Sequence, residues 1–162
     1  MLGSPVENGY RPEYTRGSSS QTLRAGLEEY YRENPGLLDP QRMDAAAAAL
    51  FRSHDAAHVV FGCDTTLRGE TLIDLWTIFA STIGLRGYLA YLRLPQVQAL
   101  FAEVGLVQIA IELARCTPDA LRVIARSRRL SAKWPWDDYR AHLDERLADL
   151  RRSFHIRVLS GD

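Results

Sequence analysis

The chain of 162 residues carries twenty basic and twenty acidic side chains, so its formal net charge at pH 7 is zero. A balanced charge gives no general attraction to nucleic acid, and we expect no nucleic-acid partner. The hydrophobic share of 46% is that of an ordinary globular protein. The length suits one domain with a hydrophobic core of its own.

No apolar stretch is long enough to cross a bilayer, and the N-terminal residues lack the apolar core of a signal peptide. We therefore expect a cytoplasmic protein. Its two cysteines, Cys63 and Cys116, show no CxxC spacing and are expected to be free thiols in a reducing compartment.

Composition divides the chain into three parts. Residues 1–20 are rich in glycine, proline, serine and charge, which predicts a disordered tail. Residues 21–157 are expected to form one helical domain, followed by a short C-terminal tail over residues 158–162. No strand pattern, repeat or low-complexity tract interrupts the helical patterns, so we predict an all-α, single-domain bundle of five to seven helices.

The first half of the domain contains three expected helices. One covers residues 22–34, and a longer one covers residues 40–62 with Asp39 as its N-terminal cap. Residues 63–69 are typical of a turn, and a third helix starts at Glu70.

The second half continues in the same way. A helix over residues 95–116 is apolar almost all round and is therefore expected to be buried. A short helix follows from Pro118. The last one runs from about residue 134 to residue 153, with acids at its start and arginines at its end, as the helix dipole favours.

Four potential metal ligands lie close together in the segment HDAAHVVFGCDTTLRGE. His54 and His58 are four residues apart on a helix, so both rings can face one point. Asp55 lies beside them, and Glu70 follows His58 after eleven residues and a turn. This mixed nitrogen and oxygen set suits zinc, iron, manganese or magnesium. Two histidines that are either on the surface or hydrogen-bonded, with unrelated helix-end carboxylates, would give the same pattern.

This pattern resembles the signature of the coenzyme Q biosynthesis protein 4 family, an HD pair, a second histidine and a later glutamate. Here these are His54, Asp55, His58 and Glu70. The C-terminal stretch WPWDDYRAHLDERLADLRRSFHI is also similar to the family's closing pattern, and the resemblance covers roughly residues 22–156. Cys63 departs from the family, which more often has an aromatic residue there.

The resemblance implies that all four residues bind a metal, usually zinc. It also implies a role in ubiquinone biosynthesis, as a metal-dependent lyase that removes the C1 carboxylate of a polyprenylated hydroxybenzoate with coupled hydroxylation. For this reaction, Asp55 or Glu70 is alternatively a candidate catalytic proton carrier, if the metal does not fully engage it. The family further implies contact with a membrane surface and with other quinone-biosynthesis proteins. A homodimer is also possible.

Apolar helices offer a place for a prenyl tail, and a groove leading to the metal is the natural site. The expected lipid-binding residues are Leu72, Leu75, Trp76, Phe79 and Ile83. Each of them could equally be an ordinary core residue. A basic cluster lies further along, and it is either a solvated helix end or a face toward an anionic membrane or phosphate. Its members are Arg122, Arg126, Arg128, Arg129 and Lys133.

The main alternative to an enzyme is a scaffold that binds prenyl lipid and holds a structural metal. Coordination separates the two, because a catalytic zinc keeps one position open and a structural zinc is closed. A phosphohydrolase of the HD type fits poorly, since the chain has no histidine before His54.

Overall fold

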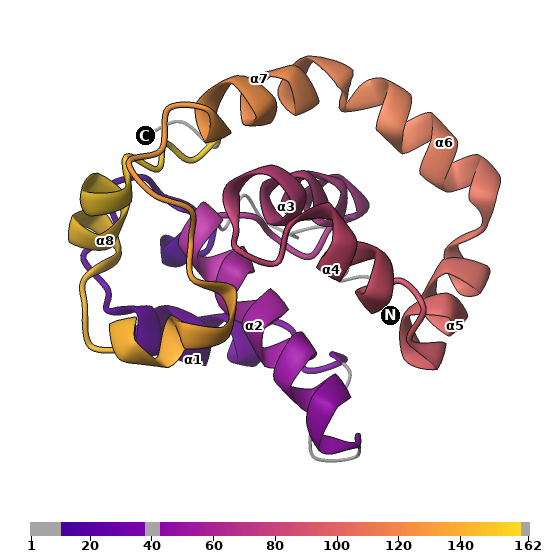
Figure 1. The fold of residues 1–162 in the computed structure, drawn as a ribbon, viewed down its shortest axis with the longest axis horizontal. Coiled ribbons are helices and arrows are strands. Elements are labelled where there is room, and N and C mark those ends of the chain that lie inside the picture. The colour runs from indigo at the N-terminus through magenta and orange to yellow at the C-terminus, as the bar shows by residue number, and fades with distance from the viewer. Residues whose placement is uncertain (1–10, 38–42, 160–162) are drawn as a thin grey trace.

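The structure is a computed structural model that describes residues 11–37 and 43–159 (Figure 1). In these ranges it has eight α-helices and two short 3-10 helices, which confirms the all-α class with one α-helix more than the expected maximum of seven. The α-helices are α1 (Leu23–Glu33), α2 (Ala45–Phe61), α3 (Leu67–Ala80), α4 (Gly84–Tyr91), α5 (Pro95–Val104), α6 (Leu106–Arg115), α7 (Thr117–Ser127) and α8 (Leu147–Phe154). The 3-10 helices are η2 (Glu13–Thr15) and η4 (Trp136–His142).

The first two predicted helices are present as α1 and α2. Thr22 caps α1 by accepting a hydrogen bond from the main-chain nitrogen of Ala25. Helix α2 begins at Ala45, where Asp44 accepts hydrogen bonds from two main-chain nitrogens of the first turn. Asp44 therefore performs the capping that was expected of Asp39, which lies outside the described residues together with Pro40.

The turn between α2 and α3 is shorter than the expected 63–69. Gly62 ends α2 with a φ of 67°, a left-handed conformation that glycine adopts without strain. Thr66 already caps α3 by accepting from the nitrogen of Gly69. Glu70 consequently lies in the first turn of α3, where the helix dipole favours a carboxylate.

The prediction of one buried helix over residues 95–116 is wrong. It is divided into α5 and α6 at Gly105, whose φ of 84° is incompatible with a continuous helix. Helices α6 and α7 form an arc that passes over α3 (Figure 1). The outer side of α6 is open to solvent, and Val107 is 75% exposed.

The end of the chain also differs from the expectation. Instead of one helix over 134–153, η4 and α8 are separate elements. Trp134 and Trp136 are fully buried, and they extend the core that α1, α2 and α3 share. The buried side chains of Trp134 and Trp136, and not a continuous helix, therefore hold this segment against the core.

Part of the expected N-terminal tail belongs to the folded core. Within the described residues 11–20, Tyr14 is only 1% exposed and packs edge-on against Tyr30. Val158, in the expected C-terminal tail, is also buried. The ordered domain therefore extends past both of its predicted boundaries.

Arg151 of α8 connects three distant segments. Its side chain is buried, and its guanidinium donates hydrogen bonds to the main-chain oxygens of Val59 and Val60 at the end of α2. It also donates to the carbonyls of Tyr14 and Arg16 in the N-terminal segment. The carbonyls of Val59 and Arg16 also accept from the main-chain nitrogens of Gly62 and Ser19, whereas the donor to those of Tyr14 and Val60 is Arg151.

In the described part of the chain, no helix has both the length and the apolar character needed to cross a membrane.

We predict that Arg151→Met lowers the free energy of unfolding by about 3 kcal/mol, because it removes the donor to the carbonyls of Tyr14 and Val60 and breaks the link between three segments. Chemical denaturation followed by circular dichroism would measure the change. The neighbouring Arg152→Met is the control. Arg152 is exposed and, among the described residues, pairs with Asp149 on the surface, so its loss should change stability by less than about 0.5 kcal/mol. Equal effects of the two substitutions would contradict the assignment.

Candidate metal centre

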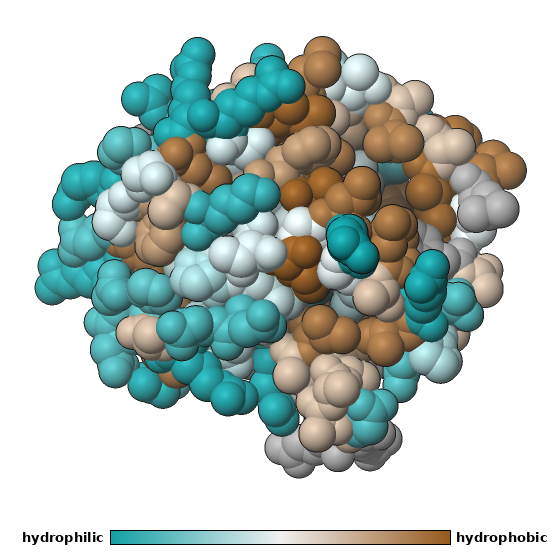
Figure 2. Space-filling view, in the orientation of Figure 1, coloured by the Kyte–Doolittle hydropathy of each residue, from teal (hydrophilic) through white to brown (hydrophobic). Residues whose placement is uncertain are grey.

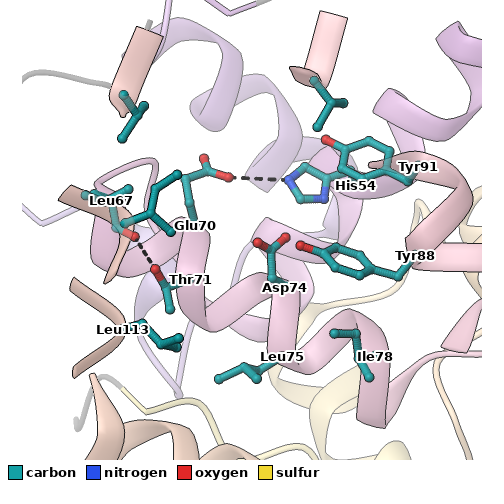
Figure 3. Close-up of a pocket in the computed structure, with 13 residues that line it drawn as sticks. His54, Leu67, Glu70, Thr71, Asp74, Leu75, Ile78, Tyr88, Tyr91 and Leu113 are labelled. Atoms are coloured by element: carbon teal, nitrogen blue, oxygen red, sulfur yellow. Dashed lines mark hydrogen bonds and ion pairs between the residues drawn. The ribbon is translucent and has the colours of Figure 1, made fainter. Parts of the chain in front are cut away.

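Two helices bring three of the predicted ligands together. His54 and His58 lie one turn apart near the C-terminal end of α2, and Glu70 lies in the first turn of α3. Figure 3 shows the Glu70 carboxylate directed at the ring of His54. The Nε2 atoms of the two histidines are 3.2 Å apart. The Glu70 carboxylate oxygens lie 3.5 Å from His54 Nε2 and 3.4 Å from His58 Nε2.

These separations fit a common metal ion. One ligand atom from each residue lies within 4.8 Å of the others, so the group could hold a metal. Around a tetrahedral zinc with bonds of about 2.0–2.1 Å, neighbouring ligand atoms are roughly 3.3 Å apart. The distances among His54, His58 and Glu70 are close to that value. The donor set therefore fits a small divalent cation without rearrangement of the helices.

The ring of His58 is held in the orientation that a ligand needs. It is completely buried and packs against Tyr30, and its Nδ1 lies 3.1 Å from the main-chain oxygen of Cys63. When Nδ1 donates to this oxygen, the lone pair of the neutral ring is on Nε2, the atom that faces Glu70. Cys63 contributes its main chain to this contact, so the departure from the family at this position leaves the orientation unaffected.

The charges in the centre reinforce one another. Burial favours the neutral form of Glu70, but the nearby His58 and His54 prevail and lower the pKa of its carboxyl well below the usual range. Burial likewise opposes the charged form of His58, yet the Glu70 carboxylate prevails and raises the pKa of His58 to about 9. A carboxylate and an imidazolium ion are thus the stable forms in the metal-free centre.

Asp55 does not join the three ligands. Its Oδ2 accepts a hydrogen bond from the Tyr31 hydroxyl of α1 at 3.0 Å, and its carboxylate is not part of the group that could hold a metal. Burial is the main cause that raises the pKa of Asp55. In this geometry Asp55 connects α1 to α2 beside the centre, whereas both histidines and Glu70 face inward.

A cavity of about 280 Å³ adjoins the candidate metal centre (Figure 3). His54 and Glu70 form part of its wall, and the ring of Tyr91 stacks on His54 with centroids 5.3 Å apart. Most of the remaining wall is aliphatic, from α3, α5 and α6. The cavity therefore has a polar end at the ligands and an apolar remainder. Its lining residues are His54, Leu67, Glu70, Thr71, Asp74, Leu75, Ile78, Tyr88, Tyr91, Val97, Val104, Ile109 and Leu113.

Of the five residues expected to bind lipid, only Leu75 lines the cavity. Leu72 and Trp76 are core residues, and Trp76 stacks on Phe61. Ile83 packs against the same core, and Phe79 is exposed. The most apolar face of α3 packs in the core. The face that lines the cavity contains both polar and apolar residues.

Asp74 is a cavity residue that sequence reasoning missed. It follows Glu70 by one helical turn on α3, a spacing that could have indicated it. Burial raises the pKa of Asp74 to about 6, although His54 and a hydrogen bond with Tyr88 favour its ionised form.

The basic cluster around the end of α7 lies outside the cavity lining. Arg122 pairs with Asp119, and Arg126 donates hydrogen bonds to main-chain oxygens of the C-terminal segment. Arg128, Arg129 and Lys133 are exposed. Two members of the cluster therefore have partners within the fold.

Comparison with known proteins identifies no relative: no family model matches the chain, and no curated protein or solved structure is significantly similar to it.

We predict that the purified protein binds about one divalent cation per chain, measured by plasma mass spectrometry after loading with zinc and gel filtration. His58→Ala and Glu70→Ala should each lose the metal, because each removes one of three ligands. Asp55→Asn should retain it, because Asp55 bonds to Tyr31 in this geometry. If Asp55→Asn also lost the metal while remaining folded, that result would contradict the three-ligand centre.

Metal binding should also release a proton at neutral pH. His58 is protonated in the metal-free centre below a pH of about 9, and a cation must displace that proton. The apparent affinity for zinc should therefore rise by up to about tenfold per pH unit between about pH 6 and about pH 8. Titration against a competing chelator would measure it, and an affinity independent of pH would contradict the raised pKa of His58.

Proposed function

We propose that this chain is a metal-dependent protein of ubiquinone or related prenylquinone biosynthesis, which acts on the acidic head group of a polyprenylated hydroxybenzoate. One observation carries the proposal: two members of the group of His54, His58 and Glu70, namely His54 and Glu70, line a largely aliphatic cavity. A ligand with a metal-binding head and an apolar tail is the chemistry that fits both parts. The sequence pattern shared with the coenzyme Q biosynthesis protein 4 family supports the same assignment.

The number of ligands favours a catalytic centre over a structural metal. Two histidines and one glutamate leave a fourth position of a tetrahedral ion to water or substrate. Asp55, the residue that would close the coordination, is engaged by Tyr31 instead. Zinc is the cation that we propose, since a centre of two histidines and one glutamate is a known catalytic zinc set.

In the proposed reaction the bond between C1 and the carboxylate breaks, carbon dioxide leaves, and the electron pair stays on the ring as negative charge. A proton from water then takes the place of the carboxylate, or, when dioxygen is the oxidant, a hydroxyl group does. When bound, the metal would act as a Lewis acid that orients the head group and stabilises this charge. The chain itself holds the ligands by packing and hydrogen bonds. The aliphatic wall from Leu75, Ile78 and Leu113 limits water around the ring, which strengthens electrostatic stabilisation.

The cavity is large enough for a ring and the beginning of a tail, but a polyprenyl chain is longer. Its continuation would pass between α3 and α6, because Leu113 both lines the cavity and is half exposed. Hydrophobic surface gathers on the α4 to α6 side of the molecule, opposite a mainly hydrophilic side (Figure 2). Val107 and Ile111 contribute exposed apolar area there. Such a surface supports peripheral contact with a membrane that contains the substrate.

The same exposed surface supports the second candidate, a scaffold that binds prenyl lipid and other biosynthetic proteins without catalysing a reaction. Val107, Ile111 and Leu121 are exposed apolar side chains on α6 and α7, and a partner or a second copy of the chain would cover them. The two candidates differ in whether the metal takes part in turnover.

The decisive experiment follows carbon dioxide release from carboxyl-labelled 3-geranyl-4-hydroxybenzoate by the zinc-loaded protein in detergent, with and without oxygen. We expect metal-dependent release of carbon dioxide. The rate should fall at least about a hundredfold in His58→Ala, because the metal stabilises the charge that develops in the transition state by several kcal/mol. Product mass would show whether a hydroxyl group replaces the carboxylate.

His142→Ala is the control, because His142 pairs with Glu145 and does not line the cavity. It should retain full activity. If the zinc-loaded protein binds the substrate but releases no carbon dioxide under either condition, the enzymatic proposal is contradicted and the lipid-binding scaffold is the better account.

A further inference from the structure

Asp74 places a second acidic group inside the cavity, separate from the three metal ligands. Its carboxylate lies beside the Tyr88 hydroxyl, and both face the same space as His54 and Glu70 (Figure 3). Asp74 is absent from the group of residues whose ligand atoms could share a metal. Metal binding therefore does not explain why a carboxylate lies in this largely aliphatic cavity.

Among the described residues that line the cavity, none is a lysine or arginine that could pair with Asp74. The charged or titratable groups that line it with Asp74, within the same described set, are His54, Glu70, Tyr88 and Tyr91. Tyr88 is only 7% exposed and provides a hydrogen bond, but one hydroxyl leaves further acceptor sites of a carboxylate unused. Asp74 is partly buried, and a carboxylate with spare acceptor sites beside an aliphatic wall is well placed to bind a donor on a ligand.

The spacing of the two acidic residues suggests which donor. Glu70 and Asp74 are four residues apart on α3, on one face and roughly 6 Å apart along the helix axis. Opposite substituents of a para-substituted benzene ring are separated by a similar distance. A ring whose carboxylate reaches the metal centre would thus bring a para substituent close to Asp74.

We propose that Asp74 and Tyr88 form a recognition site for the ring hydroxyl para to the substrate's carboxylate, so that the cavity selects 4-hydroxybenzoates over benzoates that lack this hydroxyl. The inference rests on the proposed function, because it takes the carboxylate as the group at the metal centre. The Asp74 carboxylate accepts a hydrogen bond from the ring hydroxyl, and Tyr88 orients that carboxylate.

Selectivity follows from desolvation. A ligand that lacks the hydroxyl removes water from the Asp74 carboxylate without supplying a donor, and an unpaired buried charge is costly. A hydroxylated ligand supplies the donor. The expected preference for the hydroxylated ligand is roughly tenfold or more in the dissociation constant.

The test compares two ligands, 3-geranyl-4-hydroxybenzoate and 3-geranylbenzoate, by calorimetric titration of the zinc-loaded protein. The wild type should bind the hydroxylated ligand roughly tenfold more tightly. In Asp74→Leu the preference should fall to about twofold or less, with affinity for 3-geranylbenzoate retained or increased. Asp74→Asn, which retains one acceptor oxygen, should be intermediate.

Thr71→Val is the matched control, because Thr71 lines the same cavity but donates its hydroxyl to the carbonyl of Leu67 in its own helix. It should retain the preference. Zinc content and thermal unfolding of each variant separate loss of recognition from loss of the metal or of the fold.

The outcomes distinguish the two proposals. Equal binding of both ligands by the wild type, or an unchanged preference in Asp74→Leu, would overturn the role of Asp74 while leaving the proposed function in place. Failure of the zinc-loaded wild type to bind either acid would instead overturn the proposed function, and the inference with it. Loss of zinc in Asp74→Asn would show that Asp74 is a metal ligand, which also overturns the inference.

Discussion

The reversal between α2 and α3 takes only five residues, from Gly62 to Thr66. Gly62 ends α2 in the left-handed region, and Asp64 accepts hydrogen bonds from both the main chain and the hydroxyl of Thr66. Thr66 in turn caps α3. Because the reversal is this short, the first turn of α3 is held against the last turns of α2, and the Glu70 carboxylate faces two histidine rings.

Packing elsewhere in the fold serves to hold the end of α2 in place. Arg151 donates to the main-chain oxygens of its last turn and joins them to the N-terminal segment. Trp76 stacks on Phe61, which fixes α3 against the same turn. The centre is therefore built on two rigid helices whose relative position is determined by core contacts, as a preorganised site requires.

Much of the centre could be predicted from local spacing. The interval between His54 and His58 places both rings on one helical face, and a short turn returns Glu70 to them. Asp55 could not be placed in the same way, since one residue along a helix is about 100° around its axis. That rotation is enough to direct its carboxylate to Tyr31 of α1, a contact that depends on tertiary packing.

The cavity was harder to predict than the ligands. Hydrophobicity identifies the stripe of α3 that contains Leu72 and Trp76, but this stripe forms the core. Asp74 and Thr71, in the stripe that faces the cavity, are polar. The break at Gly105 was also missed, although it lets α6 arch over α3 and contribute Ile109 and Leu113 to the cavity. Such features depend on which neighbours are present, and single-helix patterns do not contain that information.

The central claim is that His54, His58 and Glu70 share one metal ion at the edge of the cavity. Anomalous diffraction from crystals of the zinc-loaded protein, measured on both sides of the zinc absorption edge, tests it most directly. The account predicts one strong anomalous peak about 2.0–2.1 Å from both Nε2 atoms and a Glu70 oxygen, with a further ligand on the cavity side. A peak at another position in the protein, or no peak at all, would contradict it.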